Sequence, residues 1–376
     1  MDDHPTAVVV GAGVFGAATT LALSRRGWRV TLIEGVTPGH DAASSGGDTR
    51  LLRSSHGPQP WYTALAWAAR DGWLALEDET GIDVLVETGL VWFAREDFHG
   101  WEADSEAVLT DLSVPVERLA PDRVAELFPS VRTDDLAFGL WEPHAGVLRA
   151  AVGTRALVAR SAALGAQVRV GVTGRPERGA VRTDDEVLRA DRVVWACGPW
   201  LSAVFGGRFA LSVTQQDACW FTTGPDWHAD RVPAWVDFAG AAYGVGGLDG
   251  HGFKCSSDRQ GPPFDPDADE RVALPAHVAA ARDILGHRFP ELADAPLART
   301  RTCQYTTTVD TEFLIAPLDD DTVWIAGGGS GHAFKHGPAL GEYVADLVDG
   351  TRAPDPRFGL GEREPAGSLR TAGHEG

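Results

Sequence analysis

The sequence lacks the features that mark several classes of protein. It has no excess of basic residues, because the formal net charge is −20 over 376 residues, whereas surfaces that bind nucleic-acid phosphates are basic. It has no run of about eighteen consecutive apolar residues, so a membrane-spanning helix is not expected. Its four cysteines include no CxxC pair and predict neither a metal site nor a disulfide framework. The acidic start lacks the pattern of a secretory signal, so we expect a cytoplasmic protein. Together these observations predict no metal, no nucleic acid and no membrane as a partner.

The first thirty-five residues contain the most informative pattern. An apolar run over 7–10 leads into Gly11, Gly13 and Gly16, then a helical stretch, then a second apolar run that ends at Glu34. The glycines allow a sharp turn, close approach to a pyrophosphate and tight packing of the helix on the sheet. Glu34 follows about twenty residues on, where a carboxylate can accept hydrogen bonds from an adenosine ribose. An ordinary glycine-rich turn is the simpler alternative, but the complete pattern favours a dinucleotide site for NAD or FAD.

Two later segments suggest that the chain returns to this site. An apolar strand over 193–197 ends at Gly198, and a strand over 323–326 runs into a glycine-rich turn before a helix over 338–348. Both ends of the chain are therefore expected to serve one ligand. Further helices are expected over 62–80, 102–112, 121–128, 150–164 and 274–285. Further strands are expected over 84–94, 167–170, 212–221, 235–245 and 252–256.

Five motifs together carry a resemblance to a known family. They are GAGVFG at 11–16, GDTRLLR at 47–53, GFK at 252–254, CQYTTTVD at 303–310 and SGHAFK at 330–335. In this order and spacing, the sequence resembles the monomeric sarcosine oxidase and N-methyltryptophan oxidase group of flavin amine oxidases. The resemblance spans nearly the whole chain, which makes it more specific than any single motif.

The resemblance implies an α/β or α+β fold with two domains. A Rossmann-like FAD-binding domain would be discontinuous, over 1–80, 146–211 and 309–376. A substrate domain built on a mostly antiparallel sheet would cover 81–145 and 212–308. The implied activity is oxidation of a secondary or cyclic amino acid to an imine, with reduction of FAD and then of O2 to hydrogen peroxide. The implied protein is a monomer whose partners are a small-molecule amine and O2.

The resemblance also implies a set of cofactor contacts. These residues are Gly11, Gly13, Val14, Phe15, Gly16, Glu34, Gly47, Thr49, Arg50, Gly198, Cys303, Gly329, Gly331, His332, Phe334 and Lys335. Among them, Cys303 matches the cysteine that forms a thioether to the flavin 8α carbon. A buried structural thiol is the commoner fate of a lone cysteine, but the polar strand end with adjacent threonines favours the reactive interpretation.

Four further functions are implied at numbered positions. Lys254 resembles the lysine beside the flavin N5 that assists O2, where a fixed cation stabilises developing superoxide. Arg53 and Lys335 resemble the pair that binds the substrate carboxylate, a function that suits a planar guanidinium and a compact ammonium. Arg50 resembles the arginine near the flavin ring. Tyr243 and Tyr305 match pocket tyrosines, although either residue could belong to the core.

Two positions depart from the family pattern. Asp258 occupies the position of a family histidine, four residues after Lys254. It would either add negative charge to the pocket, which suits a substrate with a basic or hydroxylated side group, or point into solvent. Gly46 stands where the family often has a histidine before its Gly-Asp-Thr-Arg segment, a change that bears on flavin attachment.

Three other functions remain as alternatives. An NAD(P)H-dependent flavin hydroxylase would share the N-terminal pattern but leave Cys303 unexplained. An NAD-only dehydrogenase would leave the C-terminal glycine turn unexplained. A non-catalytic FAD-binding subunit of a dehydrogenase complex would not need Lys254, Arg53 and Lys335. The amine itself stays open among sarcosine, other N-methyl amino acids, cyclic imino acids such as proline or pipecolate, and a biosynthetic intermediate.

Overall fold

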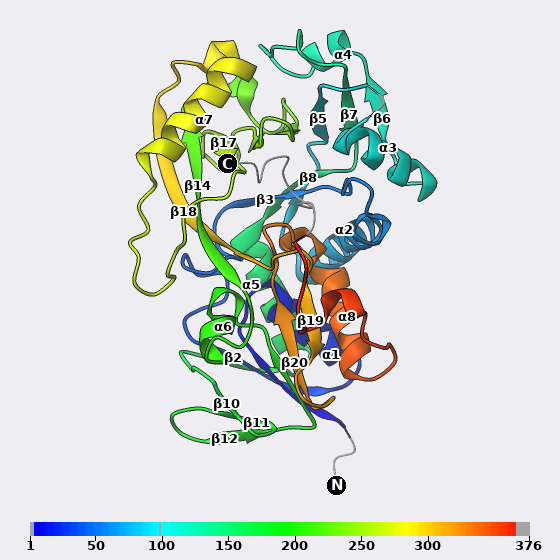
Figure 1. The fold of residues 1–376 in the computed structure, drawn as a ribbon, viewed down its shortest axis with the longest axis vertical. Coiled ribbons are helices and arrows are strands. Elements are labelled where there is room, and N and C mark those ends of the chain that lie inside the picture. Colours follow the sequence, from blue (N-terminus) through cyan, green and yellow to red (C-terminus); the bar gives the residue numbers. More distant parts are fainter. Residues whose placement is uncertain (1–3, 98, 366–376) are drawn as a thin grey trace.

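Two large sheets organise the molecule. The computed structural model describes residues 4–97 and 99–365, and the last part of the segment 309–376 lies outside this range. Figure 1 shows a six-stranded sheet in the lower half and an eight-stranded sheet in the upper half. In the described ranges, no helix is long and apolar enough to cross a membrane.

The six-stranded sheet has the order β19-β20-β13-β1-β2-β9 and is parallel except for β19. Its strands are β1 (Thr6–Val10), β2 (Arg29–Glu34), β9 (Gln167–Val170), β13 (Arg192–Trp195), β19 (Leu314–Pro317) and β20 (Val323–Gly327). The central strands read as continuous apolar runs because helices cover the faces of a parallel sheet. This sheet confirms the Rossmann-like prediction.

Helices from distant parts of the chain pack around this sheet. They are α1 (Val14–Arg25), α2 (Pro60–Thr80), α5 (Ala150–Ala163), α6 (Leu201–Val204) and α8 (Gly337–Val348). Helix α1 packs against α8 and α5, so the first of these helices lies beside the last. Gly341 permits the close approach of α8, because a Cβ there would overlap the backbone carbonyl of Ala18.

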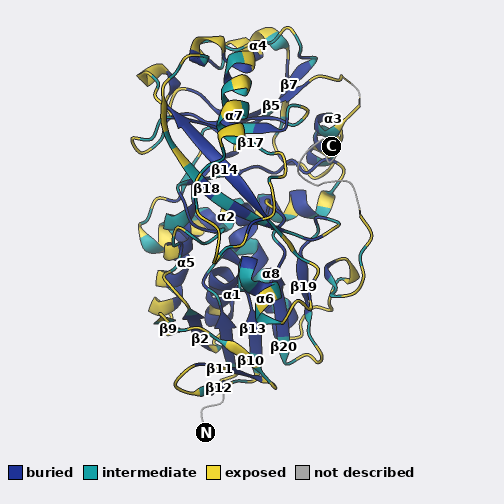
Figure 2. Ribbon diagram, turned by 60° about the vertical axis from the view of Figure 1, so that its left-hand side comes forward, coloured by how far each residue is buried: buried dark blue, intermediate teal, exposed yellow. Residues whose placement is uncertain are grey.

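The eight-stranded sheet has the order β18-β14-β17-β16-β15-β5-β7-β6. Its strands are β5 (Leu90–Ala94), β6 (Glu117–Leu119), β7 (Phe138–Glu142), β14 (Ser212–Phe221), β15 (Ala234–Asp237), β16 (Ala242–Val245), β17 (Phe253–Ser257) and β18 (Leu297–Thr307). Every neighbouring pair is antiparallel except β15 and β5, which confirms the mostly antiparallel prediction. Figure 2 shows that the long, buried strand β14 runs from this sheet towards the centre of the molecule.

Three sequence-based expectations were wrong in detail. The expected strand over 235–245 is a hairpin, because the Asp237 side chain accepts a hydrogen bond from Gly240 N at 2.7 Å and closes a turn. The expected helix over 121–128 ends earlier, as α4 (Pro121–Ala125). Cys303 lies within β18 rather than at a strand end.

Two small sheets were not foreseen, because their strands have only two to four residues. One contains β3 (Thr49–Leu52), β4 (Leu85–Val86) and β8 (Gly146–Arg149), and the other contains β10 (Arg175–Glu177), β11 (Ala180–Arg182) and β12 (Val187–Arg189). The remaining longer helices are α3 (Trp101–Asp111) and α7 (Pro275–Arg288). The strands of the two large sheets fall within the segments assigned to the two domains, whose boundaries remain a prediction.

Candidate active site

A cavity of about 420 Å³ lies beyond the ends of β1, β2 and β13. Four of the expected cofactor residues line it: Gly11, Gly13, Glu34 and Gly198. A Cβ at Gly11 would lie 2.5 Å from the carbonyl oxygen of Ala196, and its φ is +97°, so this turn accommodates only glycine without strain. The lack of side chains leaves room for a ligand backbone at the start of α1.

Glu34 is held at this cavity by the backbone. Its carboxylate accepts hydrogen bonds from Ala12 N at 2.7 Å and Val36 N at 3.0 Å. The carboxylate therefore lies beside the glycine turn, where a ribose of a dinucleotide would bind. Cavity size, turn and acid together fit the adenosine end of FAD.

Other expected cofactor residues build the turns rather than the cavity wall. Val14, Phe15 and Gly16 are buried in the first turn of α1. Gly329 lies in the turn after β20, where a Cβ would be 3.0 Å from that of Ala333 and 3.3 Å from the Phe15 ring. These residues shape the site without lining the cavity.

A second, small cavity joins Cys303 to Lys254. Both residues line it together with Thr49, Arg50, Tyr243 and Tyr305. Cys303 is a half-buried free thiol, and Arg50 Nη2 lies 3.7 Å from its Sγ.

Lys254 is buried at the centre of this region, with 4% of its surface exposed. Its Nζ lies 3.3 Å from Thr49 Oγ1 and 3.4 Å from the Thr49 carbonyl oxygen. The ammonium also lies 5.5 and 5.2 Å from the ring centroids of Trp220 and Tyr243. Burial first, and then the charge of Arg50, lowers the pKa of Lys254 to about 7.

A third cavity, of about 80 Å³, gathers most of the expected catalytic and substrate residues. The expected residues that line it are Arg50, Arg53, Tyr243, Asp258, Tyr305, Gly331, His332, Phe334 and Lys335. They come from β3, β16, β17, β18 and the turn before α8, or lie directly beside these elements. Residues separated by up to 285 positions in the chain therefore share one cavity.

Arg53 and Lys335 provide two buried cations at this cavity. The Arg53 guanidinium donates to the Ser55 carbonyl and lies 5.0 Å from the Trp92 ring centroid. Lys335 Nζ donates to the His332 carbonyl oxygen at 2.6 Å. Both side chains are at least nine-tenths buried, where an anion interacts with them more strongly than in water.

The wall of the same cavity also holds the two tyrosines and Asp258. The Tyr305 hydroxyl lies 3.5 Å from Asp258 Oδ1. Burial first, and then Tyr305 and Asp258, holds the pKa of Tyr243 well above its ordinary value, so the phenol stays neutral. Of the two alternatives for Asp258, its half-buried position on the cavity wall supports the one in which it faces the pocket.

The loop before β3 explains why Gly46 cannot be a histidine here. A Cβ at Gly46 would overlap the carbonyl oxygen of His40 and lie 3.1 Å from Arg301 Nη2. No side chain fits at this position without a backbone shift. Gly47 is less crowded, since a Cβ there would lie 2.8 Å from Arg301 Nε at the end of a side chain, but its φ of +85° favours glycine.

Sequence reasoning missed several residues of the site. Ser45 Oγ accepts a hydrogen bond from Val14 N at 2.9 Å and lines the large cavity. Trp92 lines the third cavity, together with Arg53 and Lys335. His56 and His336 lie close to the cation pair; burial first, and then the charge of Lys335, holds the pKa of each well below its ordinary value. Each histidine follows an expected cation by three residues or fewer, and this proximity in the sequence is what could have indicated that they belong to the site.

Comparison with known proteins agrees with this geometry. The family described as FAD dependent oxidoreductase (DAO) matches residues 6–347. Monomeric sarcosine oxidase of Streptomyces avermitilis is 31% identical over 364 residues, which cover 92% of this chain and 94% of that protein. N-methyl-L-tryptophan oxidase of Yersinia pestis is 25% identical and covers 92% and 95%.

Solved structures show the same fold. NikD, described as an unusual amino acid oxidase essential for nikkomycin biosynthesis, has a TM-score of 0.78 at 25% identity and covers 98% of this chain and 100% of its own. L-proline dehydrogenase from P. horikoshii has a TM-score of 0.83 at 19% identity and covers 95% and 96%. The family model and the similar sequences agree with the glycine turn, Glu34 and the large cavity beside them, and the chain belongs to the family of FAD-dependent oxidoreductases.

Proposed function

We propose that this enzyme oxidises a secondary or cyclic amino acid at its C–N bond, with O2 as the electron acceptor. The amine loses two electrons and two protons and becomes an imine, and O2 gains them and becomes hydrogen peroxide. One observation carries the proposal: two buried cations, Arg53 and Lys335, share a cavity with Tyr243 and Tyr305, which also line the cavity of Lys254. The names of the similar proteins support the same class of substrate.

Arg53 and Lys335 are proposed to bind the substrate carboxylate. The guanidinium offers two parallel donors, and the ammonium adds a point charge. Because both cations are buried, their attraction for a carboxylate between them is much stronger than the same interaction in water. Binding of this end would place the reacting C–H at a fixed position, which is a catalytic contribution of proximity.

The same cations help to keep the substrate amine neutral. A neutral amine can release electrons, whereas an ammonium cannot. Positive charge near the amine disfavours a further positive charge and lowers the amine pKa. The Tyr243 phenol on the same cavity stays neutral and does not offset this effect, so Asp258 is the one carboxylate among the described residues of the cavity wall that opposes it.

Lys254 is proposed to act in the reaction with O2. The chemistry that FAD supplies when bound is transfer of two electrons from the C–N bond to O2. Lys254 would hold a positive charge where dioxygen becomes anionic, in a site with little access to water. Thr49 and the rings of Trp220 and Tyr243 hold its ammonium in place.

Cys303 is proposed to hold FAD through an 8α thioether. Its Sγ lies beside the Arg50 guanidinium and shares a cavity with Lys254, so a flavin attached here would lie at the proposed O2 site. Gly46 does not provide the histidine found in the resembling family, and the Arg50 guanidinium, with Nη2 at 3.7 Å from Sγ, is a cation beside the thiol instead. Acid precipitation tests the bond: yellow colour in the pellet is expected, and colour in the supernatant contradicts it. A Cys303→Ser variant is the control and should release its flavin.

Asp258 is proposed to favour a substrate with a basic or hydroxylated side group. Its carboxylate lies on the wall of the cavity that also holds the cation pair. This charge weighs against sarcosine itself, which has no side group to meet it. We also propose that the protein is cytoplasmic and that it is a monomer; the names of the similar monomeric sarcosine oxidases support only the monomer.

A peroxide-coupled screen tests the proposed function. The panel contains sarcosine, other N-methyl amino acids, proline and pipecolate, and secondary amino acids with basic side groups. Each acid is paired with the same amine lacking the carboxylate. We expect peroxide from at least one acid and a much lower rate from its paired amine. Absence of peroxide with every acid would support a non-catalytic FAD-binding subunit instead.

A further inference from the structure

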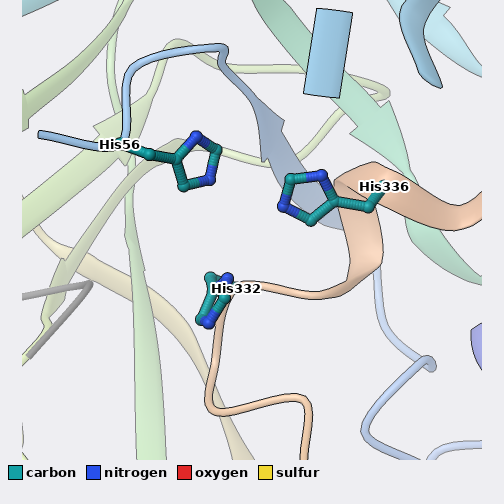
Figure 3. A group of neighbouring side chains, drawn as sticks. All are labelled: His56, His332 and His336. Atoms are coloured by element: carbon teal, nitrogen blue, oxygen red, sulfur yellow. The ribbon is translucent and has the colours of Figure 1, made fainter. Parts of the chain in front are cut away.

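Three histidines meet behind the cation pair. His56 follows β3, while His332 and His336 lie in the turn before α8. Their exposed fractions are 0%, 4% and 0%. Figure 3 shows the three rings facing one another, and one ring nitrogen of each lies within 4.8 Å of those of the other two. His332 is an expected cofactor contact and its carbonyl holds Lys335, but no step of the proposed oxidation uses the ring nitrogens of the three histidines.

Backbone carbonyls determine the tautomers of two of the rings. His56 Nδ1 lies 2.9 Å from the Ser54 carbonyl oxygen, and His332 Nε2 lies 3.0 Å from that of Thr311. A carbonyl oxygen only accepts, so each of these nitrogens carries the hydrogen. The other nitrogen of each neutral ring then has a lone pair. Anchoring of one nitrogen by a carbonyl while the other bears a lone pair is the usual arrangement of metal-binding histidines.

His336 supplies the second, independent observation. It is fully buried, and neither of its ring nitrogens has a hydrogen-bond partner among the described residues. His56 Nε2 also lacks a partner in this part of the chain. A buried polar nitrogen without a partner is energetically costly, so a group that accepts the lone pairs of His56 and His336 would stabilise the cluster. A neutral His336 itself supplies a single N–H, which can pair with only one neighbouring lone pair.

We propose that His56, His332 and His336 bind a transition-metal ion of the class that imidazole selects, such as zinc. Zinc–histidine bonds are about 2.0–2.1 Å long and zinc ligands are arranged tetrahedrally, so two nitrogens on one ion lie roughly 3.4 Å apart. The nitrogens of the cluster, at up to 4.8 Å from one another, would therefore have to approach by up to about 1.4 Å. The ligand set contains no carboxylate, which disfavours calcium and magnesium.

The neighbouring charges restrict which ions can bind. Lys335 and Arg53 lie close enough to act on His56 and His336, and they repel any cation at the cluster. The bonds to nitrogen must offset this repulsion. Ions late in the first transition row, with the strongest bonds to imidazole, are therefore favoured over manganese or iron.

Cobalt provides the probe for a binding experiment on the holoenzyme. Untagged protein is stripped with a chelator and dialysed against Co²⁺, whose visible bands lie to the red of the flavin. We expect about one equivalent of cobalt by elemental analysis, visible bands typical of nitrogen ligands, and displacement by Zn²⁺. Binding is read without turnover, so the result does not depend on the proposed oxidase activity.

Matched variants locate the site. His56→Gln and His336→Gln should each weaken cobalt binding at least tenfold, whereas a variant with both His144→Gln and His287→Gln, at half-exposed positions, should bind like the parent. Flavin absorbance and thermal unfolding verify that each variant is folded. Zn²⁺ should raise the unfolding temperature of the parent and not that of the two cluster variants. Occupancy far below one equivalent, or cobalt binding that survives in both cluster variants, would overturn the proposal.

Discussion

Lys254 and Lys335 are the only lysines in the sequence, and both are buried in the candidate active site. All other basic side chains that carry a full charge are arginines, which stay protonated in proteins. An ammonium is compact, and its pKa responds to burial, so lysine suits positions where charge must be adjustable. Because there are only two lysines, labelling of lysine side chains allows both buried amines to be observed one by one.

The charge of Lys254 should change near neutral pH. Burial lowers its pKa from 10.5 to about 7, so the side chain is charged below that pH and neutral above it. In holoenzyme labelled with ¹⁵N-lysine, one of the two side-chain signals should titrate near pH 7. The rate of flavin reoxidation by O2 should fall as the pH rises through the same range. A titration near 10.5, or a flat rate profile, would contradict the prediction.

Replacement of Lys254 should separate the two half-reactions. Lys254→Met keeps an unbranched side chain but removes the charge, so reoxidation should slow by roughly a thousandfold, or about 4 kcal/mol of barrier. Anaerobic reduction by substrate should change little. Stopped-flow measurement of each half-reaction gives the comparison. Equal losses in both would show that Lys254 acts on substrate binding or on the fold.

Arg53→Lys tests recognition of the carboxylate. The variant keeps the charge but loses the planar pair of donors, so kcat/KM for an amino acid found in the screen should fall about 10–100-fold. The low rate with the paired amine, which has no carboxylate, should not change. A similar loss with both compounds would indicate damage to the pocket rather than lost recognition.

Among the elements of the fold, the loop between β2 and β3 connects the large cavity beside Glu34 to the expected catalytic residues. It carries Ser45, which binds Val14 N, and Gly46, which is enclosed by His40 and Arg301. The loop then enters β3, which carries Arg50. A shift of this loop therefore changes the start of α1 and the surroundings of Cys303 together.

Gly46→Ala should weaken FAD binding. The added methyl group overlaps the His40 carbonyl, so the loop must move, and overpacking of this kind typically costs about 1–3 kcal/mol. We expect a lower melting temperature and a lower content of bound flavin in the purified protein. Gly286→Ala is the matched control, because its methyl group would lie 3.8 Å from the nearest atom outside its own helix, the Ala293 Cβ. Normal flavin content in Gly46→Ala would contradict the crowding argument.

At the scale of the whole molecule, the two ends of the described chain form one unit. Arg26, after α1, donates to Glu342, Asp346 and Asp349 at the end of the chain that contains α8. The helices themselves approach closely at Gly341. Contacts between residues so distant in sequence close the FAD-binding half around its sheet.

Gly341→Ala should destabilise the whole molecule. Its methyl group would overlap the backbone of Ala18, which cannot rotate away, so we expect a loss of about 1–3 kcal/mol in the free energy of unfolding. Urea unfolding followed by tryptophan fluorescence measures this loss. Gly286→Ala again serves as control and should be neutral or slightly stabilising, because alanine favours a helix. Unchanged stability in Gly341→Ala would show that α8 can shift freely.

The features that depend on near neighbours in the chain could be predicted from the order of its residues. The glycine turn, Glu34 at the end of β2 and most helices and longer strands follow from local periodicity and turn chemistry. The motifs also indicated the family, because their spacing extends over the chain.

The properties that depend on distant residues could be described only from the folded chain. The burial of Lys254, the crowding at Gly46 and the meeting of His56 with His332 and His336 come from elements brought together by folding. The physical reason is that solvation, steric room and charge depend on whichever atoms surround a group. For these residues, those atoms lie far away along the chain.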